Sequence, residues 1–124
     1  MTLFIKNIQK YIDTIDICKV KMPTRKVFAA LLLDKRNDEY TIILNTNNTT
    51  INQQRNSVIH ELIHYHYNDL ESQNNINIIE QRTHKLTKYY KRHISYNLKA
   101  YIEHKIKISN NYDAKTGKKL PCRQ

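Results

Sequence analysis

Two histidines, His60 and His64, lie four residues apart, and Glu61 follows the first of them directly. Residues at this spacing share one face of a helix, so the two imidazoles would point toward a common position. Neutral imidazole is a good zinc ligand, and zinc lowers the pKa of a bound water to about 7. Glu61 can take a proton from such a water and pass it to a leaving amine. The pattern therefore predicts a zinc site that hydrolyses a peptide bond, with Glu61 as the catalytic base.

A catalytic zinc is held by three protein ligands and keeps one position open, so a third ligand must come from elsewhere. In one protease pattern it is a histidine six residues after the second histidine, but Leu70 stands at that position. The other common arrangement uses a glutamate from a later helix, and Glu80 lies at the edge of an apolar helix face. Glu71 and His84 are the alternatives. We predict Glu80 as the ligand and His84 as a residue that supports a ligand or contacts substrate.

The elements that must position these residues follow from hydrophobic periodicity. Apolar residues recur at helical spacing in four stretches: 4–17, 53–67, 76–93 and 96–108. Two short apolar runs, 27–33 and 40–44, flank polar turn residues and predict a β-hairpin. Asn52 is expected to cap the helix that carries the two histidines. The predicted fold class is therefore α+β: a short antiparallel sheet, an active-site helix and about three further helices.

The 124 residues suit one domain, which we place at 1–108, with a basic tail at 109–124 that is either mobile or a loose hairpin. No stretch approaches the roughly 18 apolar residues that a membrane span needs. The first residues do not resemble a signal peptide. The two cysteines, Cys18 and Cys122, are far apart and form no disulfide framework. We therefore expect a cytoplasmic protein that does not associate with membranes.

Positive charge is concentrated in the last third of the chain. Residues 1–81 carry no net charge, so residues 82–124 account for the whole net charge of +10. Within them, four basic residues recur every three to four positions: Arg82, Lys85, Lys88 and Arg92. Such a stripe fits contact with DNA or an acidic partner, and it also fits an ordinary solvated helix face.

The stretch from Arg55 to His64 resembles the active-site helix of the ImmA/IrrE metallopeptidases, in which an arginine commonly lies five residues before the first histidine. Residues 41–45 resemble that family's strand ending in asparagine, and residues 80–84 resemble a later motif that begins with the ligand glutamate. The resemblance covers roughly residues 27–92. The chain departs from the family pattern at Ile63, where a glycine is usual, and at Arg82, where a second glutamate is usual.

This resemblance implies a short, divergent member of phage or mobile-element type, with a zincin-like fold. It implies a zinc metalloprotease whose ligands are His60, His64 and Glu80, with Arg55 as a further candidate for contact with substrate or ligands. Family members typically cleave or inactivate a helix-turn-helix repressor, which becomes the expected partner here. The alternative is a catalytically inactive zincin-like protein that binds a repressor or DNA through its basic C-terminal third.

Overall fold

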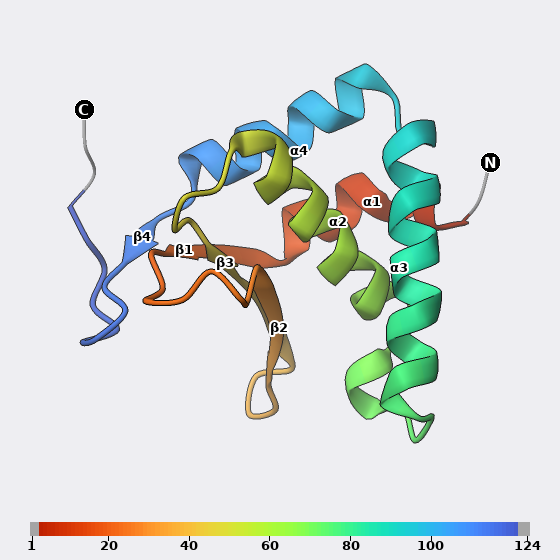
Figure 1. Cartoon of the computed structure of the whole chain (residues 1–124), viewed down its shortest axis with the longest axis horizontal. Coiled ribbons are helices and arrows are strands. Elements are labelled where there is room, and N and C mark those ends of the chain that lie inside the picture. Colours follow the sequence, from red (N-terminus) through yellow and green to blue (C-terminus); the bar gives the residue numbers. More distant parts are fainter. Residues whose placement is uncertain (1–2, 122–124) are drawn as a thin grey trace.

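The chain forms four α-helices and a four-stranded sheet over residues 3–121, the residues that the computed structural model describes (Figure 1). In chain order the elements are α1 (Leu3–Thr14), β1 (Asp16–Val20), β2 (Ala29–Asp34), β3 (Glu39–Asn45), α2 (Ile51–His66), the 3₁₀ helix η1 (Asp69–Glu71), α3 (Ile76–His93), α4 (Tyr96–Ile108) and β4 (Asn111–Tyr112). The predicted α+β class is therefore confirmed. The last two predicted helices have the bounds of α3 and α4.

The sheet is mixed and has the strand order β2-β3-β1-β4. β2 and β3 form the predicted antiparallel hairpin, in which Leu31 lies opposite Ile42. The sheet continues with parallel pairs that were not predicted, because β1 pairs with both β3 and β4. This order leaves β2 at one edge of the sheet.

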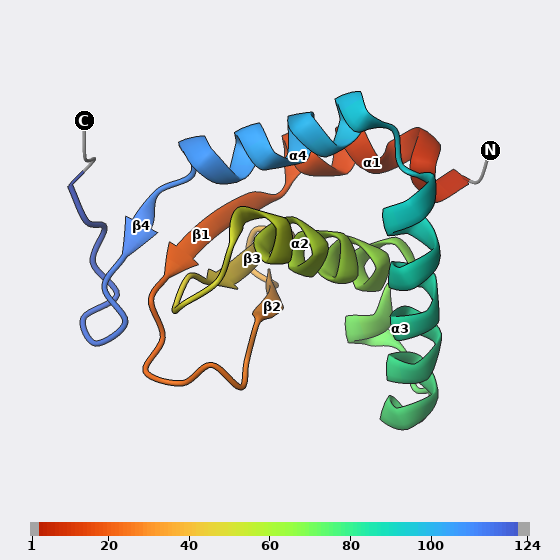
Figure 2. The same ribbon diagram turned by 45° about the horizontal axis from the view of Figure 1, so that its top comes forward.

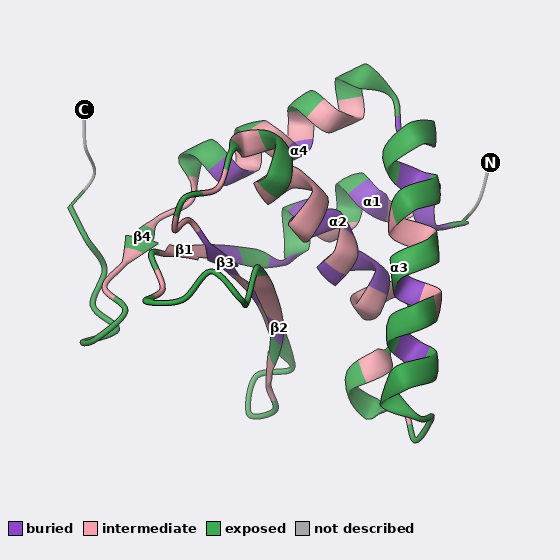
Figure 3. Ribbon diagram, viewed as in Figure 1, coloured by how far each residue is buried: buried purple, intermediate pink, exposed green. Residues whose placement is uncertain are grey.

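The helices lie on one face of the sheet, and α2 lies directly against it (Figure 2). Alternate residues of β3 point toward α2, and of these Ile42 and Leu44 are fully buried. Ile59, Leu62 and Ile63 of α2 are fully buried as well, and Figure 3 shows the buried part of α2 in purple. α3 packs beside α2 through Ile79, Thr83 and Tyr90, and α4 covers α2 from another side. α2 is therefore held on several sides, which fixes the direction in which its polar side chains point.

The cap of α2 is Thr50, and the prediction of Asn52 was wrong. The Thr50 hydroxyl oxygen accepts from the backbone N–H of Gln53 (3.2 Å), and the Gln53 side chain accepts from the backbone N–H of Thr50 (2.9 Å). This reciprocal pair satisfies two amides at the helix start. Asn52 lies exposed in the first turn, because the helix begins two residues before the predicted start.

The first helix is shorter than predicted, and the strand that follows it was missed. α1 ends at Thr14, and β1 begins at Asp16. Ile15 and Ile17 are both buried, but Ile17 is buried by pairing opposite Ile42 in the sheet. The apolar residues thus continue into a strand whose pairing partner lies far along the chain.

After α4 the chain returns to the sheet. Asn111 and Tyr112 form β4 beside β1, and Tyr112 also bridges to Lys119 across a turn. A loose hairpin, one of the two predicted forms of the tail, is therefore present up to residue 121. Cys122 and Arg123 lie outside the described residues. Within residues 3–121, no helix has the length and apolar character needed to cross a bilayer.

Asn45, the last residue of β3, fixes the connection between β1 and β2. Its buried side-chain oxygen accepts from the backbone N–H groups of Met22 (3.1 Å) and Asn47 (2.9 Å). Its amide nitrogen donates to the carbonyl oxygens of Thr24 (2.8 Å) and Val27 (2.7 Å). The amide therefore uses both donors and both acceptor positions.

Replacing Asn45 with alanine should lower the free energy of unfolding by about 2–4 kcal/mol, because several buried backbone groups lose their partners. Urea denaturation of the two proteins measures this loss. Asn37→Ala, in the exposed turn between β2 and β3, is the control and should change stability by less than about 0.5 kcal/mol. Equal losses in the two variants would contradict the anchoring role of Asn45.

Candidate metal centre

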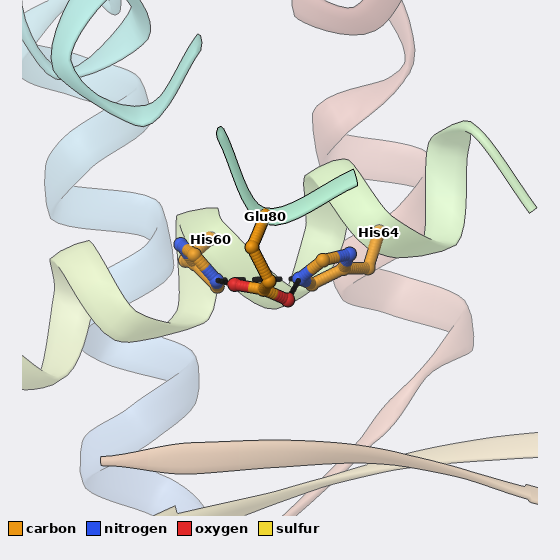
Figure 4. A group of neighbouring side chains, drawn as sticks. All are labelled: His60, His64 and Glu80. Atoms are coloured by element: carbon orange, nitrogen blue, oxygen red, sulfur yellow. Dashed lines mark hydrogen bonds and ion pairs between the residues drawn. The ribbon is translucent and has the colours of Figure 1, made fainter. Parts of the chain in front are cut away.

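His60 and His64 of α2 and Glu80 of α3 point toward one position (Figure 4). The two Nε2 atoms are 3.2 Å apart. The Glu80 carboxylate spans them, with one oxygen 3.1 Å from Nε2 of His64 and the other 3.5 Å from Nε2 of His60. The structure thus brings together the three predicted ligands, two from one helix and one from the first turns of the next.

The other ring nitrogen of each histidine is engaged. The Thr87 hydroxyl donates to the carbonyl of Thr83 (2.8 Å), so its oxygen accepts from Nδ1–H of His60 (3.3 Å). The Asp69 carboxylate accepts from Nδ1–H of His64 (2.8 Å). A neutral imidazole that carries its proton on Nδ1 has a lone pair on Nε2. When both rings are neutral with their protons on Nδ1, the two Nε2 lone pairs face each other and the Glu80 carboxylate.

Such a convergence of lone pairs fits a cation. A tetrahedral zinc with bonds of roughly 2.0–2.1 Å holds its ligand atoms about 3.3 Å apart, close to the 3.1, 3.2 and 3.5 Å separations found here. Burial, followed by the neighbouring His64, lowers the pKa of His60, which keeps its ring neutral and able to bind a metal. The Glu80 side chain is 55% exposed, so the site is open on that side. Three protein ligands and an open side are the arrangement of a catalytic zinc site.

Asp69 is a functional residue that the sequence reasoning missed. Its side chain is only 5% exposed, and the oxygen that contacts His64 also accepts from the guanidinium of Arg82. The Arg82 guanidinium in turn lies 4.3 Å from the centre of the Tyr67 ring. These contacts tie η1 and the end of α2 to α3, close to Glu80. A carboxylate that fixes the tautomer and direction of a ligand histidine is a common support of metal sites.

Arg82 was predicted to belong to an exposed basic stripe, but its guanidinium contacts Asp69 instead. Its charge is used inside the protein, against Asp69. The other members of the stripe, Lys85, Lys88 and Arg92, are exposed on α3 as predicted.

Glu61, the residue after His60, is buried, with 7% of its surface accessible. Burial raises the pKa of its carboxyl to about 7; the adjacent His64 lowers this pKa, and the charge of Glu80 raises it. A carboxyl with a pKa near neutral pH can both accept and return a proton under physiological conditions. Glu61 thus has the protonation behaviour required of a base that later acts as an acid.

Two clefts meet at Glu61. The first, of about 450 Å³, is lined by Val27, Phe28, His60 and His84 among others. The second, of about 420 Å³, is lined by His64, Glu80 and a set of apolar side chains. Ala29 of β2 lines the first cleft and Leu31 lines the second, so the edge strand forms one wall of both.

The remaining candidates lie at varying distances from this centre. His84 is exposed and lines the first cleft together with His60 and Glu61, so it is placed to contact a bound molecule. Arg55 pairs with Glu103 of α4 (3.5 Å) and lines neither cleft. Glu71 is exposed and accepts from the Asn68 side chain (3.2 Å), outside the ligand group.

No protein-family model, curated protein or solved structure matches this chain.

Replacing Asp69 with asparagine should weaken zinc binding by about 10–100-fold, because an amide holds the Nδ1–H of His64 less strongly than a carboxylate. Competition with a chromogenic chelator measures the dissociation constant. Arg82→Met should weaken binding in the wild-type background but add little to Asp69→Asn, since Arg82 acts through Asp69. Lys85→Met on the same helix is the matched control and should leave zinc affinity unchanged. Additive losses from the Asp69 and Arg82 changes would contradict this linkage.

The raised pKa of Glu61 makes the stability of the metal-free protein depend on pH. Because the folded state binds this proton more tightly than the unfolded chain, stability should fall as pH rises from about 4.5 through 7. A shift from 4.5 to about 7 corresponds to roughly 3 kcal/mol above pH 7.

Glu61→Gln removes this ionisation. With chelator present, it should therefore be more stable than the wild type at pH 8, by about 2–3 kcal/mol, and nearly equal at pH 5. Denaturant unfolding at the two pH values tests this expectation. Glu39→Gln, at an exposed position, serves as the control. If Glu61→Gln changed the free energy of unfolding by the same amount at both pH values, the expectation would be contradicted.

Proposed function

We propose that this protein is a zinc-dependent endopeptidase of narrow specificity, with a zincin-like active site. The observation that carries the proposal is the convergence of ligand atoms from His60, His64 and Glu80 on one position. Both ligand histidines have their Nδ1 protons held by Thr87 and Asp69, while their Nε2 atoms face Glu80. A buried carboxyl, that of Glu61, adjoins this group and has a pKa of about 7. Two imidazoles, a carboxylate and a nearby base are the parts that metal-assisted hydrolysis of an amide needs.

In this proposal His60, His64 and Glu80 hold the metal. When bound, zinc supplies Lewis acidity, which acidifies water and polarises a carbonyl group. Glu61 takes one proton from the attacking water as its oxygen bonds to the carbonyl carbon of the peptide. It then gives that proton to the amide nitrogen as the carbon–nitrogen bond breaks. The products are a free amine and a carboxylic acid, whose remaining proton passes to the amine, and Glu61 returns to its ionised form.

A protein substrate is supported by the shape of the site. The clefts extend on two sides of Glu61, and β2, which borders both, is an edge strand paired only with β3 among residues 3–121. The unpaired side of an edge strand can hydrogen-bond to an extended peptide segment. A chain passing along β2 would therefore present a peptide bond to Glu61.

The partner we propose is a helix-turn-helix repressor in a phage or mobile-element circuit, within the cytoplasm. The support is the resemblance of residues 55–64 and 80–84 to the ImmA/IrrE metallopeptidases. The exposed cations of α3 are compatible with a repressor that is bound to DNA.

A second candidate function is binding without cleavage. The observation that favours it is that Lys85, Lys88 and Arg92 are exposed and form no ion pair within the described part of the chain. Such cations are available to phosphates or to acidic side chains, and binding through them would weaken steeply as salt is added. This function would need neither the metal ligands nor Glu61.

The two functions separate in one experiment whose substrate is a helix-turn-helix repressor, taken from a neighbouring gene where that gene encodes one. Zinc-loaded wild type should cleave it, whereas Glu61→Gln should keep about one zinc per chain and lose about 10²–10⁴-fold in cleavage rate. His60→Ala and His64→Ala should lose the zinc, as measured by metal analysis after gel filtration. Lys10→Gln, at an exposed position of α1 outside both clefts, is the control for general damage.

Cleavage retained by Glu61→Gln would remove the proposed mechanism. Equal binding of the repressor by metal-free and zinc-loaded protein, with no cleavage by either, would favour the second function instead.

A further inference from the structure

Besides residues of the metal centre and the polar Ser72 and Asn74, the second cleft is lined by four aliphatic side chains. Leu31 of β2 and Ile79 of α3 are buried in it. Leu70 of η1 and Ile76, the first residue of α3, complete its apolar lining while remaining largely exposed. These four side chains come from three different elements, so the cleft is assembled by the tertiary fold.

Two members of this lining, Leu70 and Ile76, are exposed apolar side chains. Ile76 is 75% exposed and follows two asparagines at the start of α3. Ile78, on the same helix, is 64% exposed but does not line the cleft. Exposure of an isoleucine alone therefore identifies no site. The difference is that Ile76 and Leu70 border a cavity that reaches Glu61, His64 and Glu80.

We propose that this cleft binds a large apolar side chain of the substrate, at a residue next to the bond that is cleaved. The proposal rests on the endopeptidase function proposed above. Glu61 lines the cleft, so a segment whose peptide bond lies at Glu61 places a neighbouring side chain between Leu31, Leu70, Ile76 and Ile79. The apolar surface on both partners leaves water when that side chain enters. The substrate class is thus an extended protein segment with leucine, isoleucine, methionine or phenylalanine at this one position.

A cleavage test uses a pool of peptides from a digested proteome, incubated with zinc-loaded protein and analysed by mass spectrometry. The cleaved peptides should share large apolar residues at a single position beside the cut. For those peptides, Ile76→Asn and Leu70→Asn should each lower kcat/KM by about tenfold or more, since an apolar pocket discriminates by roughly 10–200-fold. Ile78→Asn is the matched control and should cleave at the wild-type rate. Cleavage without apolar enrichment, or equal losses at Ile76 and Ile78, would overturn the proposal.

A binding test separates this proposal from the catalytic one. Two amino-acid hydroxamates, of leucine and of glycine, differ only in the side chain that they present beside a zinc-binding group. Titration calorimetry with zinc-loaded Glu61→Gln should show the leucine compound binding at least about tenfold more tightly, and Ile76→Asn should remove that preference while Ile78→Asn keeps it. If this preference is observed but no peptide is cut, the cleft proposal stands and the endopeptidase function fails. Equal binding of the two compounds overturns the cleft proposal even if cleavage is observed.

Discussion

The site depends above all on where the Nδ1 protons of His60 and His64 are held. Thr87 accepts one of them and Asp69 the other, and each contact turns the Nε2 lone pair of its ring toward Glu80. Without these two acceptors, either ring could carry its proton on Nε2 and form a hydrogen bond to the Glu80 carboxylate. The group would then be an ordinary surface network. Two hydrogen bonds remote from the convergence point therefore decide whether three common residue types can bind a cation.

The rest of the fold holds α2 so that this arrangement is maintained. The sheet packs under Ile59 and Ile63, while α3 and α4 pack along the sides of the helix. The same packing buries Glu61 between β2 and α3 and raises its pKa to about 7. Ile63 occupies the place where the resembled family usually has glycine, and it is fully buried. In this protein the hydrophobic core accommodates the whole isoleucine side chain at that position of α2.

Local sequence patterns predicted the helices that local spacing and caps define. They did not predict elements and contacts that depend on residues far away in the sequence. The bounds of α3 and α4 follow from regular apolar spacing and from caps formed by Asn75 and Ser95. β1 was missed because its pairing with β3 and β4 depends on residues more than twenty positions away. The ligand group could be predicted from spacing and helix faces. Asp69 could not, because its contacts with His64 and Arg82 depend on how the chain turns after α2.

The turn after α2 allows one short segment of the chain to supply the whole ligand group. Asn68 adopts a left-handed backbone conformation (φ 56°), which reverses the chain and brings Asp69 back beside the helix that it has just left. The ligands and both supporting acceptors consequently lie between His60 and Thr87, in a helical hairpin whose closure costs little chain entropy. Leu31, by contrast, comes from a separate hairpin earlier in the chain. One wall of the second cleft is thus encoded in a different segment from the ligand group, and mutations at Leu31 can change that wall during evolution while His60, His64 and Glu80 stay in place.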